Sequence, residues 1–228
     1  MYHREFKVIP KLAFTVFNRL LLRSYPNYQP VYLDNILKIG SDRGCVDRWE
    51  LIKKEILSHN ATSLMDIGCA EGFYTIQATK ECGCFSIGVD ADIRRLSIAQ
   101  NQLIGGKIKP AGFLLGVVDE ALLEKTPAFD VIIFMSVMHH MMYTYGVEYS
   151  RMILQKIRLK TKKCMIFEMG QSDETLNAWA RNLPDMGTNP HEWIKDFLLS
   201  CGFSKALKIG ETDSYKKDRK RALFVVEP

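Results

Sequence analysis

From residue 63 onward, short apolar runs alternate with segments of helical periodicity, and this alternation constrains the fold more than any other feature of the chain. The apolar runs are the predicted strands, at Ser63 to Gly68, Cys84 to Asp90, Gly112 to Val117, Phe129 to Met135 and Cys164 to Glu168. Strands separated by helices of about ten residues or more form βαβ units. The sequence therefore predicts a parallel sheet with helices on both faces.

The last part of the chain departs from this alternation. Residues 203–211 and 221–227 are two further strand-like stretches, and the polar turn 212–220 joins them. Such a pair is typical of an antiparallel hairpin. We therefore expect an α/β fold with a doubly wound, mainly parallel seven-stranded sheet that ends in an antiparallel hairpin.

The N-terminal part, residues 1–45, is predicted to be a helical extension to a main domain at 46–228. Apolar residues recur at helical spacing between positions 6 and 21, with basic residues beside them. A basic amphipathic helix of this kind packs on its own domain or on a second subunit, or lies on an anionic membrane surface. Asp47 is expected to cap a second helix, at about Arg48 to Ser58.

Composition sets limits on class and compartment. A chain of 228 residues has the usual size of one domain. Its net charge of +5 permits an anionic partner but is smaller than expected of a dedicated nucleic-acid binder. The six cysteines lack paired CxxC spacing and a companion histidine cluster, so free thiols in a reducing, cytoplasmic compartment and no zinc site are expected. Asn18 and Arg19 interrupt the apolar stretch 12–22, so neither a signal peptide nor a membrane span is predicted.

The most informative stretch is residues 64–75, which have the sequence LMDIGCAEGFYT. An apolar strand here enters a small-residue turn and then a helix, so the backbone can approach a nucleoside-like ligand closely. The turn differs from the dinucleotide pattern GxGxxG, because Asp66 ends the strand, Ala70 follows and Glu71 comes next. A carboxylate directed into the turn would repel a pyrophosphate and favour an ammonium or sulfonium group.

This stretch resembles the first motif of class I S-adenosylmethionine-dependent methyltransferases, with Ala70 in place of the middle glycine of GxGxG. Later landmarks also fit: Asp90 ends the second strand 24 residues after Asp66, and the acidic pair Asp119 and Glu120 follows the third. The resemblance implies S-adenosyl-L-methionine as methyl donor, S-adenosyl-L-homocysteine as product, ribose hydroxyls on Asp90 and adenine beside the acidic pair. The donor-binding residues that it implies are Asp66, Gly68, Ala70, Glu71, Gly72, Asp90, Ala91, Asp119, Glu120 and Ser136, and no metal is expected. The acidic turn and the terminal hairpin make an NAD-type Rossmann enzyme the weaker reading.

Candidate catalytic groups follow the fourth and fifth strands. A histidine of near-neutral pKa could take a proton from a hydroxyl or hold an anionic acceptor oxygen, which makes His139 and His140 candidates. One of the two is expected to face the site, and the alternative is that a histidine here only bonds to backbone. Glu168 could orient a histidine, bind the acceptor or simply cap its strand.

Several sequence features of other methyltransferase classes are absent. No Asn-Pro-Pro-Tyr sequence follows the fourth strand, which counts against methylation of amino groups on adenine, cytosine or glutamine. No cysteine follows it either, so a covalent route to a pyrimidine carbon lacks its nucleophile. Met135 and Ser136 stand where the Lys-Asp-Lys-Glu set of ribose 2′-O-methyltransferases would place Asp.

A closer resemblance rests on six short stretches. They are MSVMHHM at 135–141, YGVE at 145–148, IFE at 166–168, IGETD at 209–213, CAEGFY at 69–74 and RWELI at 48–52. These stretches are similar to the methyltransferase part of bacterial bifunctional enzymes that cap O-antigen polysaccharide. The resemblance implies methylation of oxygen on a saccharide hydroxyl or a saccharide phosphate in cell-surface glycan synthesis.

Two basic segments could serve that role. The basic residues of the last turn could meet an anionic acceptor, or they form only a solvated hairpin turn; they are Lys216, Lys217, Arg219, Lys220 and Arg221. The N-terminal helix could contact the inner membrane face, where lipid-linked acceptors lie. Three alternatives stay open: an RNA methyltransferase, a small-metabolite O-methyltransferase that uses the N-terminal helix as a lid, and a non-catalytic partner protein of the same fold. Oligomeric state is not predicted.

Overall fold

The computed structural model describes residues 20, 28–33, 36–38, 44–214, 216 and 218–228. The predicted N-terminal helix lies outside these residues, except for Leu20. Within the described part of the extension, β1 (Val31–Leu33) and β2 (Ile36–Lys38) form a small antiparallel sheet that the sequence analysis did not predict. The domain boundary after residue 45 stays a prediction.

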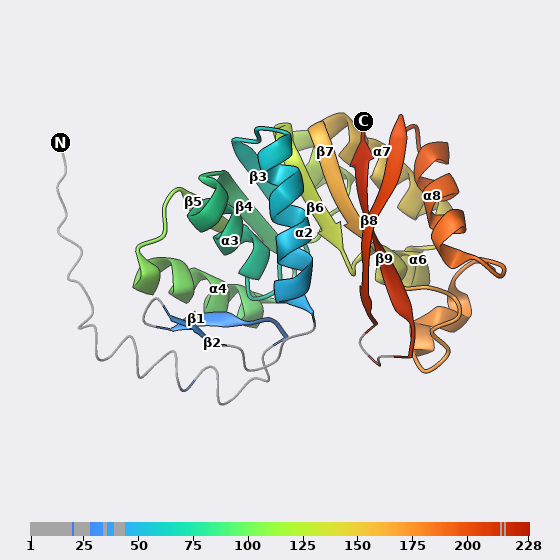
Figure 1. The fold of residues 1–228 in the computed structure, drawn as a ribbon, viewed down its shortest axis with the longest axis horizontal. Helices are drawn as coiled ribbons and strands as arrows, with labels where there is room; N and C mark the ends of the chain where they lie inside the picture. Colours follow the sequence, from blue (N-terminus) through green and yellow to red (C-terminus); the bar gives the residue numbers. More distant parts are fainter. Residues whose placement is uncertain (1–19, 21–27, 34–35, 39–43, 215, 217) are drawn as a thin grey trace.

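The main sheet has seven strands, in the order β5-β4-β3-β6-β7-β9-β8 (Figure 1). The parallel strands are β3 (Ser63–Ile67), β4 (Phe85–Asp90), β5 (Ala111–Leu115), β6 (Phe129–Met135) and β7 (Thr161–Glu168). The strands β8 (Lys205–Asp213) and β9 (Lys220–Glu227) form the terminal hairpin, and β9 runs antiparallel to β7. The predicted fold class is thus confirmed, with strand boundaries that differ by a few residues.

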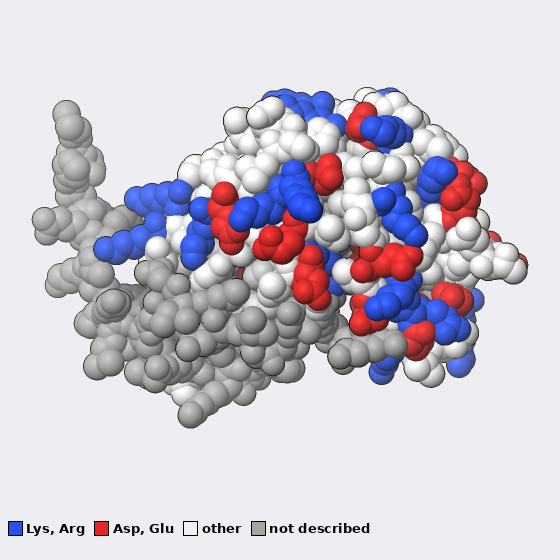
Figure 2. Space-filling view, in the orientation of Figure 1, with Lys and Arg blue, Asp and Glu red and all other residues white. Residues whose placement is uncertain are grey.

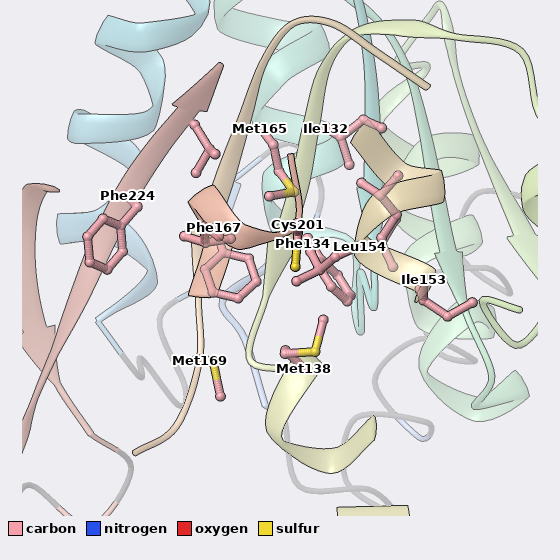
Figure 3. Packing of buried hydrophobic residues seen from close by; sticks show 14 of the residues in the cluster. Ile132, Phe134, Met138, Ile153, Leu154, Met165, Phe167, Met169, Cys201 and Phe224 are labelled. Atoms are coloured by element: carbon pink, nitrogen blue, oxygen red, sulfur yellow. The ribbon is translucent and has the colours of Figure 1, made fainter. Parts of the chain in front are cut away.

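Helices cover both faces of this sheet (Figure 1). In chain order they are α2 (Cys45–Ser58), α3 (Phe73–Cys82), α4 (Ile93–Gly106), α5 (Glu120–Lys125), α6 (Met138–Tyr145), α7 (Val147–Lys160), the 3₁₀ helix η1 (Ala178–Asn182) and α8 (Pro190–Ser200). Successive strand residues point to opposite faces, so Ile133 packs in the cluster under α2 and α3. Ile132 and Phe134 pack in the cluster under α5 to α8, where the rings of Phe134 and Phe167 lie 6.0 Å apart (Figure 3).

The first helix of the domain starts earlier than expected. The amide of Arg48 donates to the carbonyl of Gly44 at 3.1 Å, so the helix already winds from Gly44, which has a left-handed φ of 72°. Asp47 is therefore not the N-cap; it lies in the first turn, where its charge still favours the positive end of the helix dipole. The first turn of this helix carries Cys45 and Arg48, which both line the polar cavity described below.

Two further features are absent from the residues that the structure describes. None of their helices combines the length and the apolar character that crossing a membrane requires. They also contain no group of three or more His, Cys, Asp or Glu side chains placed to hold a metal ion. All six cysteines are free thiols.

Candidate functional site

Two adjoining pockets lie at the carboxyl ends of β3, β4 and β6, where the order of the strands reverses. This reversal is the place where open α/β sheets bind their ligands. The first pocket is a polar cavity of about 260 Å³, and the second is an apolar pocket of about 280 Å³. Both are lined by Gly68, Asp90, Ser136, Val137 and His140. An elongated ligand with one polar and one apolar end would fit across the two.

Asp66 lies in the polar cavity at the end of β3, and its side chain is buried. Burial raises the pKa of Asp66 to about 7, although the hydroxyl of Thr75 donates to its Oδ2 at 2.8 Å. The nearby charge of Asp90 adds to the increase in this pKa. A cationic group in the cavity would favour the charged form of the Asp66 carboxyl, because opposite charges attract strongly where water is excluded.

The turn after β3 approaches the cavity with bare backbone. Gly68 has a φ of 74°, and a Cβ added there would lie 2.3 Å from a methyl carbon of Val137, so only glycine fits. Ala70 also has a positive φ, of 49°, and its amide donates to Asp90 Oδ2 at 2.8 Å. The amide of Asp92 donates to Oδ1 of the same carboxylate at 2.8 Å. Asp90 is thereby held in place, and each of its oxygens keeps a further lone pair for a ligand hydroxyl.

The apolar pocket was only partly foreseen from the sequence. Ala91 lines it, as predicted, together with residues that the sequence analysis missed: Ile67, Val89, Gly116, Val117, Val118, Met141, Thr144 and Tyr145. Three of these residues, Gly116, Val117 and Val118, directly follow β5. In the sequence they form a short apolar run at the end of the third predicted strand, and this run was the signal from which the pocket could have been predicted. The lining suits the flat, weakly polar surface of a base.

Asp119 and Glu120 are not among the residues that line either pocket. Asp119 is the N-cap of α5, and its Oδ1 accepts from the amide of Leu122 at 2.8 Å. Glu120 forms an ion pair with Lys156 at 3.1 Å. Asp119 thus serves as a helix cap and Glu120 as a surface ion-pair partner. Neither carboxylate lies with the predicted donor-binding residues that line the two pockets.

Glu71 and Gly72 are also not among the residues that line the two pockets. The Glu71 side chain is fully buried, accepts from the amide of Tyr28 at 2.9 Å and lies 3.3 Å from the guanidinium of Arg95. Gly72 precedes α3 and packs against the ring of Phe113. The carboxylate of Glu71 therefore faces the N-terminal segment and α4, and not the pocket to which the sequence analysis assigned it.

The two histidines have different surroundings. His139 is buried, its Nδ1 accepts from the amide of Gly170 at 3.0 Å, and its ring lies 4.3 Å from that of Trp179. Burial lowers the pKa of His139 well below its usual value. His140 lines both pockets, and partial burial and the charge of Arg221 lower its pKa as well. His140 is therefore the one of the pair that faces the site, with an uncharged ring at neutral pH.

Glu168, at the end of β7, is the centre of a buried ionic network. Its Oε2 lies 2.6 Å from Nη2 of Arg48, and its Oε1 lies 3.2 Å from Nη1 of Arg221. Ser136, whose φ is 58°, donates its hydroxyl to Oε1 at 2.9 Å. Burial would raise the pKa of Glu168, but the two arginines hold it below its usual value. Glu168 thus joins α2, β6 and β9 around the polar cavity and does more than cap its strand.

Three of the five basic residues between positions 216 and 221 have acidic partners, and Lys217 lies outside the described residues. Arg221 is buried and binds both oxygens of Glu174, at 2.7 and 2.8 Å. Arg219 pairs with Asp173 at 2.8 Å, and Lys220 pairs with Asp213 at 2.6 Å. On the face in view, positive and negative side chains are interspersed (Figure 2). Arg221 therefore belongs to the interior of the site and not to a solvated turn.

Eight further residues of the polar cavity were not proposed from the sequence as site residues. They are Tyr28, Gln29, Cys45, Arg48, Tyr74, Arg95, Met135 and Val137. Arg48 stands in one of the stretches that carry the closer resemblance, and this was the available signal. For Tyr28 and Gln29 the sequence offered none, because they precede the domain and reach the cavity only through tertiary contacts.

Comparison with curated proteins finds two similar methyltransferases. The chain is 27% identical over 191 residues to WbdD of Escherichia coli, an O-antigen chain terminator bifunctional methyltransferase/kinase, over 81% of this chain and 25% of that protein. A second WbdD protein from the same organism is 26% identical with the same coverage. The chain thus spans about a quarter of the length of the curated relatives that it matches.

Two solved structures share the fold. The bifunctional kinase-methyltransferase WbdD has a TM-score of 0.77 at 22% identity, covering 92% of this chain and 46% of that one. The N-terminal domain of EvdMO1, in the presence of S-adenosylhomocysteine and D-fucose, has a TM-score of 0.68 at 16% identity, over 96% and 97% of the two chains. A family profile described as a methyltransferase domain matches residues 58–214, the greater part of the chain. The chain belongs to this methyltransferase family and is a class I S-adenosylmethionine-dependent enzyme.

Proposed function

We propose that the enzyme methylates an oxygen of a saccharide or saccharide phosphate during the synthesis of a cell-surface glycan. The observation that carries this proposal is His140, an uncharged imidazole at the junction of the two pockets. The similarity to O-antigen chain terminators supports a glycan as the acceptor. The six free cysteines fit activity in the reducing cytoplasm.

The residues present fit S-adenosylmethionine as the donor. Asp90 would accept the ribose hydroxyls, and the apolar pocket beside Ala91 and Val117 would hold the adenine. The polar cavity would hold the amino-acid part, with Asp66 and Arg48 as groups of opposite charge. Gly68 and Ala70 would let the backbone approach, and Ser136 lies where the pockets meet.

The donor supplies a methyl group on a positively charged sulfur, so the bond from carbon to sulfur breaks as the bond from carbon to the acceptor oxygen forms. His140 would take the proton from an acceptor hydroxyl, because a neutral imidazole can accept it at neutral pH. Glu168 does not serve as this base, because its oxygens are already engaged by Arg48, Arg221 and Ser136. We propose that Glu168 instead fixes the shape of the cavity.

Among the alternatives, the structure offers least support to an RNA acceptor. Arg219, Lys220 and Arg221, which would have met phosphates, are paired with acidic side chains. A membrane contact through the N-terminal helix stays a prediction, because that helix lies outside the described residues.

The proposal is tested by transfer of labelled methyl groups from S-adenosylmethionine to glycan, RNA and small-molecule fractions of the producing cell. We expect label in the glycan fraction, and none with the Asp90→Ala variant as control. Label that appears only in RNA or in small metabolites would overturn the proposal. Acid hydrolysis of the glycan product then distinguishes a methylated sugar, which retains the label on a monosaccharide, from a methyl ester of phosphate.

A further inference from the structure

Residues 28–32, which we call the strap, lie against the turn 68–72 and against the two helices that follow this turn, α3 and α4. Figure 1 shows β1 beside α4, and side chains of both helices bind the strap. The amide of Tyr32 donates to Oε1 of Gln102 at 2.6 Å, and the ammonium group of Lys80 lies 3.7 Å from the centre of the Tyr32 ring. The hydroxyl of Tyr32 also donates to Gln77. The strap is thus bound by polar side chains of both α3 and α4.

Glu71 ties the strap to the turn that borders the polar cavity. Its carboxylate accepts from the amide of Tyr28 at 2.9 Å, and Arg95, which lies 3.3 Å from the same carboxylate, stacks 4.8 Å from the centre of the Tyr28 ring. Gln102 links both ends of this arrangement, because its amide group also donates to the backbone carbonyl of Glu71 at 2.7 Å. A fully buried carboxylate is costly unless it is paired, so the charge of Glu71 and the docked strap depend on each other.

The strap also completes the helix that follows the turn. Gly72, the residue before α3, has no side chain with which to cap the first amides of the helix. Gln29 supplies the missing acceptor, since its Oε1 accepts from the amide of Phe73 at 3.0 Å. Tyr28 and Gln29 line the polar cavity, so a ligand there would touch the strap on one side and the turn on the other.

We propose that Glu71, Arg95 and Gln102 are positioning residues that hold the strap against the polar cavity, and that donor binding and strap docking strengthen each other. This inference rests on the donor position proposed above and on no property of the acceptor. Coupling is reciprocal: if docking of the strap increases donor affinity, a bound donor must stabilise the docked strap by the same factor. Couplings between sites in proteins commonly amount to about 5- to 150-fold in affinity.

The test uses the full chain and S-adenosylhomocysteine. Hydrogen exchange is measured at the amides of Tyr28 and Tyr32, which donate to Glu71 and Gln102, with and without saturating ligand. We expect exchange at both amides to slow when the ligand is bound. Unchanged exchange at saturation would overturn the coupling, whereas failure of calorimetry to detect any binding would overturn the proposed donor site instead.

A variant outside the cavity separates positioning from fold stability. Gln102 does not line the cavity, so Gln102→Leu can change donor affinity only through the strap and the turn. We expect a loss of at least about 5-fold in affinity, with kcat at saturating donor retained. Ile98→Val, which alters the buried face of the same helix without removing a strap hydrogen bond, should leave affinity unchanged. Equal losses in the two variants would overturn the proposal.

A second variant covers the case in which Gln102→Leu does not fold. Glu71→Gln keeps an oxygen that can accept from the amide of Tyr28 but removes the charge that faces Arg95. We expect this variant to show the same loss of donor affinity with an intact kcat. Wild-type affinity in folded Glu71→Gln would contradict a positioning role for this carboxylate.

Discussion

The guanidinium of Arg221 binds both carboxylate oxygens of Glu174, at 2.7 and 2.8 Å, in the interior of the protein. The same guanidinium lies 3.2 Å from Glu168, so one arginine of the last strand holds the loop after β7 and the floor of the polar cavity together. The basic segment 216–221, for which the sequence left a solvated turn and an anion-binding role open, thus places the buried Arg221 of β9 beside the site.

Loss of Arg221 should destabilise the protein strongly. Arg221→Met removes the buried positive charge that neutralises the carboxylates of Glu174 and Glu168. Removal of one partner from a buried ion pair costs about 3–5 kcal/mol. We expect that decrease in the free energy of unfolding, measured by urea denaturation. Arg219→Met is the matched control, because its pair with Asp173 is exposed and should contribute at most about 1 kcal/mol. Similar losses in the two variants would contradict the network described above.

Donor affinity should depend on pH through Asp66. The pKa of this carboxyl is raised to about 7 by burial, so in the free enzyme it binds a proton as the pH falls through 7. A donor ammonium group favours the charged carboxylate, and affinity for S-adenosylhomocysteine should therefore fall by up to about tenfold per pH unit below 7. Calorimetric titrations between about pH 5.5 and 7.5 keep the ligand's own amino group protonated, because the free amino acid loses that proton only at higher pH. Asp66→Asn should bind weakly with a flat profile, and an unchanged slope in that variant would rule out Asp66 as the titrating group.

Asp90→Ala should abolish measurable donor binding. The carboxylate of Asp90 is oriented by the amides of Ala70 and Asp92, and hydrogen bonds of ligand hydroxyls to a charged group contribute about 1.5–3 kcal/mol each. Losing two of them predicts a decrease of about 100-fold or more in affinity. Asp92→Ala is the control: it removes the cap of α4, at a cost of about 1 kcal/mol in stability, but keeps the amide that Asp90 uses. Unchanged affinity in Asp90→Ala would overturn the assignment of the ribose position.

The sequence predicted the features of the fold that depend on local pattern. Alternation of apolar runs and helices gave the sheet, and the placement of Asp66 and Asp90 at strand ends brought both to one edge, where the structure has them. The carboxyl ends of parallel strands lie at the same edge of a sheet. Residues at these ends could therefore be placed near one another from the sequence, without knowledge of any side-chain contact.

The structure departs most from the sequence-based expectations where these depended on side-chain direction. Glu71 lies one residue after Ala70, yet its side chain turns to Arg95 and the strap, and the sequence contains no signal for that direction. The assignment of Asp119 competed with its use as a helix cap, which the pattern of an acid before a short helix could have indicated. Tyr28 and Gln29 were missed because their role comes from contacts over more than forty positions in the sequence.

Turnover should distinguish the two histidines. His140 lines both pockets and has a lowered pKa, so His140→Ala should reduce kcat by about 10²–10⁴-fold with a hydroxyl acceptor while donor affinity is retained. The acid side of the wild-type pH profile should lie below the ordinary histidine value of 6.5 and should disappear in this variant. His139→Asn is the matched control, because the amide oxygen can still accept from the amide of Gly170, and kcat should change little. Wild-type kcat on an acceptor hydroxyl in His140→Ala would show that the imidazole is not the base. Among the described residues that line both pockets, His140 alone carries a side-chain nitrogen that could accept the proton.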